Sequence, residues 1–178
     1  MFTMIQKCSL GKVFEVFVDE PLKIHYIKEI SRKIKLAPTS VKKHLKDLDK
    51  QELIVRKKGE RFLGFIANRD NDNFIFYKKI FNLIKLKECH LLDYLIKTLY
   101  PQTIILYGSY LSGEDVEKSD IDLMIISKTK KRFNIEKFEK KLNRKIHIIT
   151  EPKLNKLPKE LKSEIINGLV LYGYLKNE

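Results

Sequence analysis

Two short segments of the sequence carry residue types suited to phosphate and metal chemistry. Gly108-Ser109 directly follows a continuous apolar run, Thr103 to Tyr107, and Asp120-Ile121-Asp122 opens a second apolar run that ends at Ile126. Both runs have the length of a buried β-strand. We therefore expect two buried strands, each with a small or acidic polar motif at one end.

The acidic motif has the spacing of a metal site. Side chains alternate between the two faces of a strand, so Asp120 and Asp122 are predicted to point to the same side, while Ile121 turns into the core. Two carboxylates held this close repel each other unless a cation lies between them. Mg²⁺ prefers oxygen ligands, so the sequence predicts that Asp120 and Asp122 bind Mg²⁺ or Mn²⁺.

The Gly-Ser motif is suited to an anion. Gly108 permits a sharp turn and a close backbone approach, and Ser109 offers a hydroxyl and an N–H group at the start of the segment that follows. An anion held beside a metal ion is the arrangement that phosphoryl or nucleotidyl transfer requires. We expect Gly108 and Ser109 to bind an anion, such as a phosphate group, beside that metal ion.

Gly108-Ser109 followed by Ser119-Asp120-Ile121-Asp122-Leu123 resembles the GS…DxD signature of the polymerase-beta-like nucleotidyltransferase superfamily, in particular its minimal nucleotidyltransferase branch. The resemblance extends roughly from residue 91 to residue 174. It implies Mg²⁺-dependent transfer of a nucleoside monophosphate from a nucleoside triphosphate (NTP) to a hydroxyl group on a protein, a small molecule or a nucleic acid. In this reading Asp120 and Asp122 are catalytic metal ligands, and Gly108 and Ser109 bind the nucleotide.

The sequence departs from that family at one catalytic position. The family places a third carboxylate on the next strand, and the matching strand here, residues 145–150, has His147 instead. Imidazole accepts protons but is a poor ligand for Mg²⁺. Three interpretations stay open: His147 is the catalytic base, Glu114 or Asp115 supplies the missing carboxylate, or the domain binds nucleotides without turning them over.

The N-terminal part has a different pattern. Apolar spacing predicts helices over residues 11–18, 27–34 and 39–51, with Pro38 in an early helical position and Thr39 or Ser40 as the cap. Two short apolar runs around a basic, Gly-containing turn predict a β-hairpin over residues 53–66. This order of elements resembles a winged helix-turn-helix. Proteins that join a winged helix to a nucleotidyltransferase domain occur among archaea, so the resemblance extends to the whole chain.

The charge balance fits a nucleic-acid partner. The 178 residues include 36 Lys and Arg against 23 Asp and Glu, a formal net charge of +13, and a basic surface gains affinity for polyanions by releasing their counterions. The winged-helix resemblance implies duplex DNA as the partner, bound by the helix over residues 39–51 and by the basic turn. A partner-docking module with solvated lysines is the alternative. The predicted DNA-binding residues are Thr39, Ser40, Lys42, Lys43, Lys46, Lys57, Lys58 and Arg61.

The sequence thus predicts an α+β chain of two domains: a winged helix-turn-helix over residues 1–84, and a nucleotidyltransferase domain over residues 85–178 with a mixed sheet flanked by helices. Two cysteines are too few for a disulfide framework, and no apolar run reaches membrane-spanning length, so we expect a cytoplasmic protein. His25, His44 and His90 lack ligand spacing and are expected at the surface or an interface. The oligomeric state has no signature. The two candidate functions are a nucleotidyltransferase and a DNA-binding regulator whose second domain binds a nucleotide or a protein partner.

Overall fold

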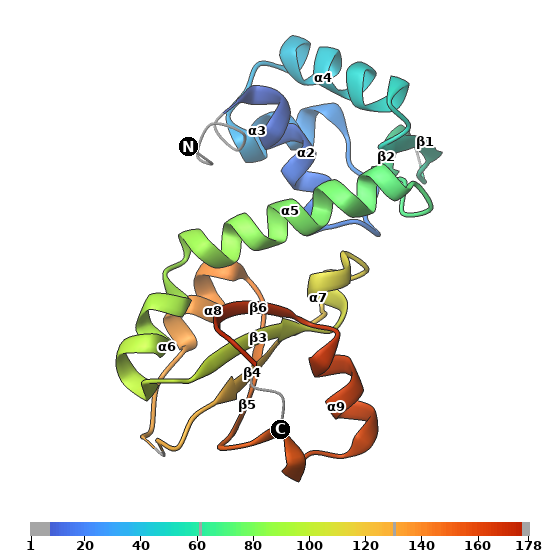
Figure 1. Ribbon diagram of the computed structural model, residues 1–178. Coiled ribbons are helices and arrows are strands. Elements are labelled where there is room, and N and C mark those ends of the chain that lie inside the picture. The colour runs from blue at the N-terminus through green and yellow to red at the C-terminus, as the bar shows by residue number, and fades with distance from the viewer. Residues whose placement is uncertain (1–7, 61, 130, 176–178) are drawn as a thin grey trace. The chain divides into compact units, whose positions relative to one another are not determined.

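The computed structural model describes residues 8–60, 62–129 and 131–175, and the chain forms two compact units that divide between Phe81 and Asn82 (Figure 1). The division falls within one continuous helix, α5 (Asp72–Glu88). The two units are described separately below.

The described part of the first unit contains three complete helices and a hairpin, in the order that the sequence predicts, followed by the first part of α5. The helices are α2 (Ser9–Asp19), α3 (Ile27–Ile34) and α4 (Pro38–Lys50). Between α3 and α4 the chain turns at Lys35, which has a left-handed φ of 53°, and Pro38 is the first residue of α4. The N-cap is Ala37, without a side-chain cap. The prediction that Thr39 or Ser40 caps this helix is therefore wrong, because both residues already lie in its first turn.

The hairpin pairs β1 (Ile54–Lys58) with β2 (Leu63–Ala67) in antiparallel register, with Ile54 opposite Ala67 and Lys58 opposite Leu63. The sequence pattern predicts Lys57 and Lys58 in the turn, but both residues belong to β1. Arg61 lies outside the described residues. A third segment joins the hairpin at His25, whose backbone exchanges hydrogen bonds of 2.7 and 2.9 Å with Phe65.

The core of this unit is formed where the apolar faces of the helices meet. α4 buries Val41, Leu45 and Leu48, the stripe that its sequence spacing predicts. Phe14 of α2 meets two rings of α5 edge-on, Phe74 at 5.6 Å and Phe81 at 5.3 Å between ring centroids. Full burial of each such ring stabilises the fold by about 1.5–3 kcal/mol.

His25 belongs to this core, so its predicted surface position is wrong. The residue is 0% exposed. Its Nε2 lies 2.9 Å from the carbonyl oxygen of Glu20, to which it donates, and its ring lies 5.0 Å from that of Phe17. Nδ1 is buried and has no hydrogen-bond partner in the described part of the chain. Burial lowers the pKa of His25 below its ordinary value, only partly opposed by the Glu20 carbonyl and carboxylate, because the charged form would lose its hydration.

The second unit is built on a mixed sheet of four strands, which are β3 (Thr103–Tyr107), β4 (Ile121–Ile126), β5 (Ile146–Glu151) and β6 (Leu169–Gly173). The strand order in the sheet is β5-β4-β3-β6. β3 pairs antiparallel with β4 and with β6, and β4 pairs parallel with β5. A 3₁₀ turn covers Leu154–Lys156. The helices that accompany the sheet, in chain order, are α6 (Leu91–Leu99), α7 (Ser109–Ser112) between β3 and β4, α8 (Glu136–Leu142) between β4 and β5, and α9 (Lys159–Ile166) between β5 and β6.

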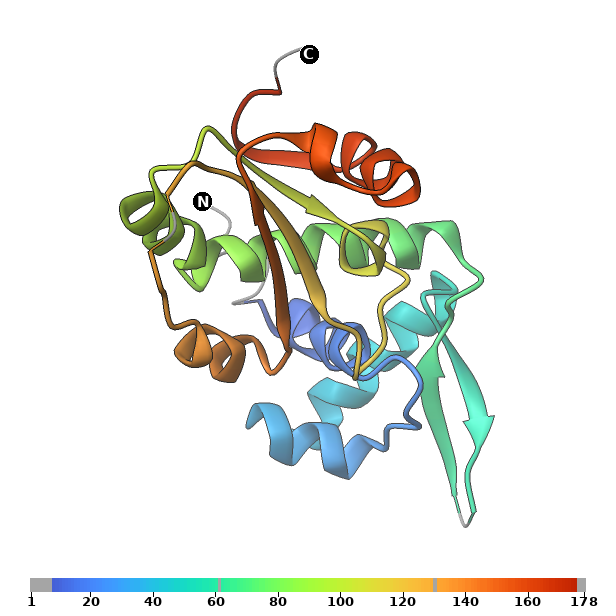
Figure 2. The same cartoon turned by 90° about the horizontal axis from the view of Figure 1, so that it is seen from below.

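Helices cover both faces of this sheet (Figure 2). On one face, alternate strand residues such as Leu106 and Leu123 pack against α6 and α8. On the other face, Ile105 and Met124 pack against Ile165 of α9. The alternation explains why β3 and the last residues of β4 read as continuous apolar runs, since both of their faces are buried. None of the described helices is long and apolar enough to span a membrane.

Candidate functional site

The ends of three neighbouring strands lie side by side in the sheet of the second unit. Because β4 runs antiparallel to β3 and parallel to β5, the end of β3 lies beside the first residues of β4 and β5. In this register Tyr107 is opposite Asp122, and Asp122 is opposite His147. Directly paired residues point to the same face of a sheet. The topology therefore brings together residues that are far apart in the sequence.

Gly108 makes the closest approach to the acidic motif. A Cβ atom built on Gly108 would lie 2.7 Å from Oδ2 of Asp122, so a side chain at this position would require that carboxylate to shift. The backbone of Gly108, with φ 75° and ψ −164°, also lies in a region that is essentially restricted to glycine. Both the turn and the carboxylate thus favour glycine at this position.

Ser109 begins α7, a helix of four residues, and is half-buried. The turn closes on itself: the amide of Ser112 donates to the carbonyl of Gly108 at 3.1 Å, and the amide of Glu114 donates to the carbonyl of Ser109 at 3.1 Å. The hydroxyl of Ser112 donates to the same Ser109 carbonyl at 3.1 Å. The backbone of the predicted phosphate-binding residues is therefore held by several short-range hydrogen bonds.

Asp120 precedes β4 and is exposed, whereas the side chain of Asp122 is 25% exposed. Ile121 between them is fully buried in the core, as the alternation predicts. His147 Nδ1 lies 3.3 Å from Asp122 Oδ1, and the rest of the His147 side chain is largely exposed. The structure thus places His147 beside Asp122, on the neighbouring strand of the sheet.

Asp120 and Asp122 supply the oxygen donors that Mg²⁺ prefers. Mg²⁺ is usually held by one or two protein carboxylates together with substrate phosphates and waters. Within residues 8–60, 62–129 and 131–175, no group of three or more His, Cys, Asp or Glu side chains is arranged to hold a metal. Asp120 and Asp122 would therefore need phosphate and water oxygens to complete the coordination.

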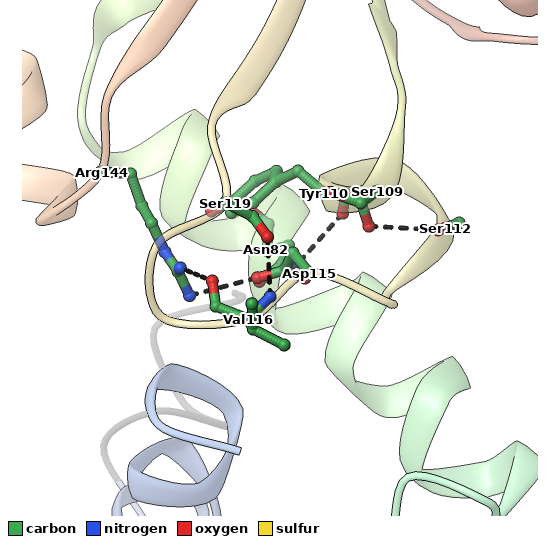
Figure 3. A network of polar contacts seen from close by, with 8 residues as sticks. All are labelled: Asn82, Ser109, Tyr110, Ser112, Asp115, Val116, Ser119 and Arg144. Atoms are coloured by element: carbon green, nitrogen blue, oxygen red, sulfur yellow. Dashed lines mark hydrogen bonds and ion pairs between the residues drawn. The ribbon is translucent and has the colours of Figure 1, made fainter. Parts of the chain in front are cut away.

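The structure excludes Asp115 as a replacement for the third carboxylate. Asp115 is 0% exposed, and its carboxylate accepts hydrogen bonds from Asn82 Nδ2 at 2.9 Å and from Arg144 at 3.2 Å (Figure 3). Glu114 is exposed, and its carboxylate accepts from the Ser112 hydroxyl at 2.9 Å. The interpretation in which Asp115 supplies a metal ligand is therefore wrong, since this carboxylate is buried in a cluster of its own.

Tyr107 lies in the same row of strand residues and has a strongly perturbed phenol. Burial, followed by the negative charges of Asp122 and Glu164, raises the pKa of Tyr107 to about 12. The phenol therefore remains protonated near neutral pH.

The comparisons with known proteins agree with this geometry. The family model described as "Polymerase beta, Nucleotidyltransferase" matches residues 90–177. Residues 90–177 are therefore similar to the nucleotidyltransferase domain of this family. The mixed sheet flanked by helices fits that assignment. No curated protein gives a significant match to the chain.

In the first unit, predicted DNA-binding residues gather around a groove between α4 and the hairpin. Lys42, Lys43 and Lys46 are exposed on one face of α4 and line this groove together with Thr39 and Arg56. Ile27, Leu63 and Phe65 complete the lining. Ser40 is half-buried outside this set, and Lys57 and Lys58 are exposed on β1.

Sequence reasoning missed three residues that the structure places at these sites. Arg56 joins the lysines of the groove and pairs with Asp49, with 3.1 Å between Nε and Oδ2. Asn82 and Arg144 bind the buried Asp115. Arg56 had a detectable signal, because it is a basic residue in a predicted strand of the hairpin. Asn82 and Arg144 had none, because both lie far in the sequence from the carboxylate that they contact.

Proposed function

We propose that the nucleotidyltransferase domain transfers a nucleoside monophosphate from an NTP to a hydroxyl acceptor in a Mg²⁺-dependent reaction, and that the first unit is a winged helix-turn-helix that binds duplex DNA. The observation that carries the enzymatic part is the approach of Gly108 to Asp122, with a virtual Cβ only 2.7 Å from Oδ2. It places a turn suited to phosphate directly against a carboxylate suited to the metal.

The residues of the chain have separable tasks in this reaction. Gly108 and Ser109 would bind the triphosphate through backbone and hydroxyl groups, while Asp120 and Asp122 would hold the magnesium ion. Such an ion neutralises the charge that develops on the transferred phosphoryl group. The acceptor hydroxyl oxygen forms a bond to the α-phosphorus, the bond from that phosphorus to the bridging oxygen breaks, and pyrophosphate leaves.

His147 is the candidate for the proton of the acceptor hydroxyl. When Nδ1 donates to Asp122 at 3.3 Å, the lone pair on Nε2 is available to accept a proton. The imidazole is largely exposed, so an acceptor can approach it. Asp122 would then orient His147 in addition to binding the metal.

The groove of the first unit supports the DNA-binding part of the proposal. Thr39, Lys42, Lys43 and Lys46 have the spacing i, i+3, i+4, i+7 and all line the groove with Arg56. A row of cations on one face of an exposed helix matches the way in which a recognition helix contacts phosphates and base edges.

A regulator without catalytic turnover is the second candidate, and the replacement at position 147 favours it. His147 carries no fixed negative charge, so a second metal ion would lack a protein carboxylate at this position. The two candidates differ in whether pyrophosphate is released, since the regulator would use its second domain to bind a nucleotide or a protein partner without turnover.

Calorimetry with each NTP tests the proposed nucleotide site. Binding should require Mg²⁺ or Mn²⁺ and should be lost in the Asp120→Ala/Asp122→Ala variant. Labelled NTP incubated with the protein, metal and candidate acceptors then separates the two functions, because only the enzyme releases pyrophosphate. Equal affinity in the presence of a chelator and in the double variant would refute the site.

Salt-dependent binding to a DNA duplex tests the first unit. Neutralising Lys42, Lys43 and Lys46 in the full chain should weaken binding and flatten its dependence on salt by roughly one released ion per lost phosphate contact. The exposed Lys87, which lies on α5 in the second unit, supplies a matched control. An unchanged salt slope in the triple variant would refute the proposed interface.

A further inference from the structure

The segment between the two sequence motifs is anchored by a buried polar cluster (Figure 3). We call it the Asp115 cluster, and it comprises Asn82, Tyr110, Asp115 and Arg144. Asp115 is 0% exposed, and the Arg144 side chain is 7% exposed. The segment that the cluster holds, residues 109–119, begins with Ser109 and ends one residue before Asp120.

Asn82 of α5 binds this segment at two points. Its Nδ2 donates to the Tyr110 carbonyl at 2.9 Å and to Asp115 Oδ1 at 2.9 Å. The Tyr110 hydroxyl in turn donates to the Asn82 carbonyl at 3.3 Å. The residue after Ser109 and the carboxylate five residues further on are therefore both fixed to the same helical turn.

Arg144 ties the same segment to the start of β5. Its guanidinium donates to Asp115 Oδ2 at 3.2 Å and also to the carbonyl of Val116. The amide of Val116 donates to the Ser119 hydroxyl at 2.9 Å, next to Asp120. Arg144 lies two residues before Ile146, the first residue of β5, and His147 follows. The guanidinium thus links the segments that carry Ser109, Asp120 and His147.

Stability alone does not account for a buried ion pair. Removing two charges from water is costly, and apolar residues of similar volume often stabilise a fold equally well or better. A pair with directed hydrogen bonds has a different property, because it permits only one arrangement of the groups that it joins. In this protein, the pair joins residues 109–119 to the start of β5, and both segments adjoin the proposed nucleotide site.

We propose that Asp115 and Arg144 are positioning residues for the metal–nucleotide site. They hold residues 109–119 so that Ser109 and Asp120 face the same triphosphate. This inference rests on the proposed function of Gly108, Ser109, Asp120 and Asp122. Neither residue of the pair contacts the nucleotide, and their effect reaches it through the segment that they anchor.

The test uses the full chain and compares three variants. Arg144→Met removes the guanidinium, Arg144→Lys keeps its charge, and Asp115→Asn keeps the shape of the carboxylate. Lys145→Gln is the matched control, since it removes an adjacent positive charge from a side chain that is 78% exposed and paired with Glu139. Urea unfolding measures stability, and calorimetry measures the Kd for Mg²⁺–ATP.

We expect Arg144→Met and Asp115→Asn to raise the Kd at least tenfold, Arg144→Lys to restore part of that loss, and Lys145→Gln to change the Kd less than threefold. Folded variants that bind with the wild-type Kd would overturn the inference. An equal loss in Lys145→Gln would also overturn it, because the effect would then be one of net charge.

Hydrogen exchange measured without nucleotide tests the anchoring of residues 109–119 independently of nucleotide binding. Peptides that cover residues 109–122 should exchange faster in Arg144→Met and Asp115→Asn, while β3 stays protected. Unchanged exchange would overturn the inference even if a variant lost affinity. If the wild-type protein bound no NTP while exchange responded as expected, the proposed function would fail and the anchoring role of the pair would stand.

Discussion

Replacing Gly108 by alanine should damage the nucleotide site through two effects whose size follows from the structure. The backbone of Gly108, with φ 75° and ψ −164°, is one that side chains rarely permit, and such strain costs on the order of 1–3 kcal/mol. The new Cβ would also lie 2.7 Å from Oδ2 of Asp122, so either the carboxylate or the turn must shift.

We expect Gly108→Ala to lower the free energy of unfolding by about 1–3 kcal/mol. We also expect a loss of Mg²⁺–ATP affinity of at least tenfold, equivalent to about 1.4 kcal/mol, because either Asp122 or the turn that begins at Gly108 must move. Urea unfolding followed by circular dichroism and calorimetry with ATP measure the two effects. Gly173→Ala is the control, since Gly173 has a similar φ of 74° but pairs with Thr103 at the opposite end of β3. Its affinity should be retained, and a Gly108→Ala protein with wild-type affinity would refute the reasoning.

Three further predictions concern other titratable or nucleophilic groups. Burial lowers the pKa of His25 in the folded state. The unfolded chain therefore takes up the proton at a higher pH than the folded chain does. The free energy of unfolding measured with urea should be highest above the ordinary histidine pKa of about 6.5 and should fall as the pH drops below it; a free energy of unfolding that stays constant between pH 5 and 8 would contradict this. At position 147, His147→Asp should raise transfer activity if a missing carboxylate limits the reaction, whereas His147→Ala should lower it if the imidazole is the base; with a known acceptor, unchanged rates in both variants would exclude either role. Finally, a thiol reagent should modify the exposed Cys8 quickly and the buried Cys89 only on unfolding, because burial raises the pKa of the Cys89 thiol; two fast-reacting thiols per chain would contradict the structure.

Local patterns in the sequence predicted much of the secondary structure. Continuous apolar runs located β3 and β4, because side chains alternate between the two faces of a strand and both faces are buried here, and the period-3.6 pattern located the buried face of α4. The same alternation correctly turned Ile121 inward between two aspartates. His147, in contrast, was singled out by the family resemblance and not by a local pattern, and it lies on a strand that pairs with β4.

Helix ends were less predictable. Thr39 and Ser40 are residue types that favour caps, yet α4 begins at Pro38 with Ala37 as the cap and no side-chain hydrogen bond. The fixed φ of proline favours the first helical position, and in this helix it outweighs the capping preference of the residues that follow. The hairpin shows a similar limit, since β1 extends through Lys58 into the predicted turn.

The sequence by itself determined which segments form strands and helices, and which motifs carry glycine, serine and paired aspartates. The burial of individual polar groups was decided only by the tertiary structure. Asp115 is of a residue type that can bind a metal, but its carboxylate accepts hydrogen bonds from Asn82 and Arg144, which lie 33 and 29 residues away in the sequence. His25 is buried because β2 and α2 cover it. Both outcomes depend on contacts between distant segments, and a local apolar pattern carries no information about which distant side chain completes a hydrogen bond.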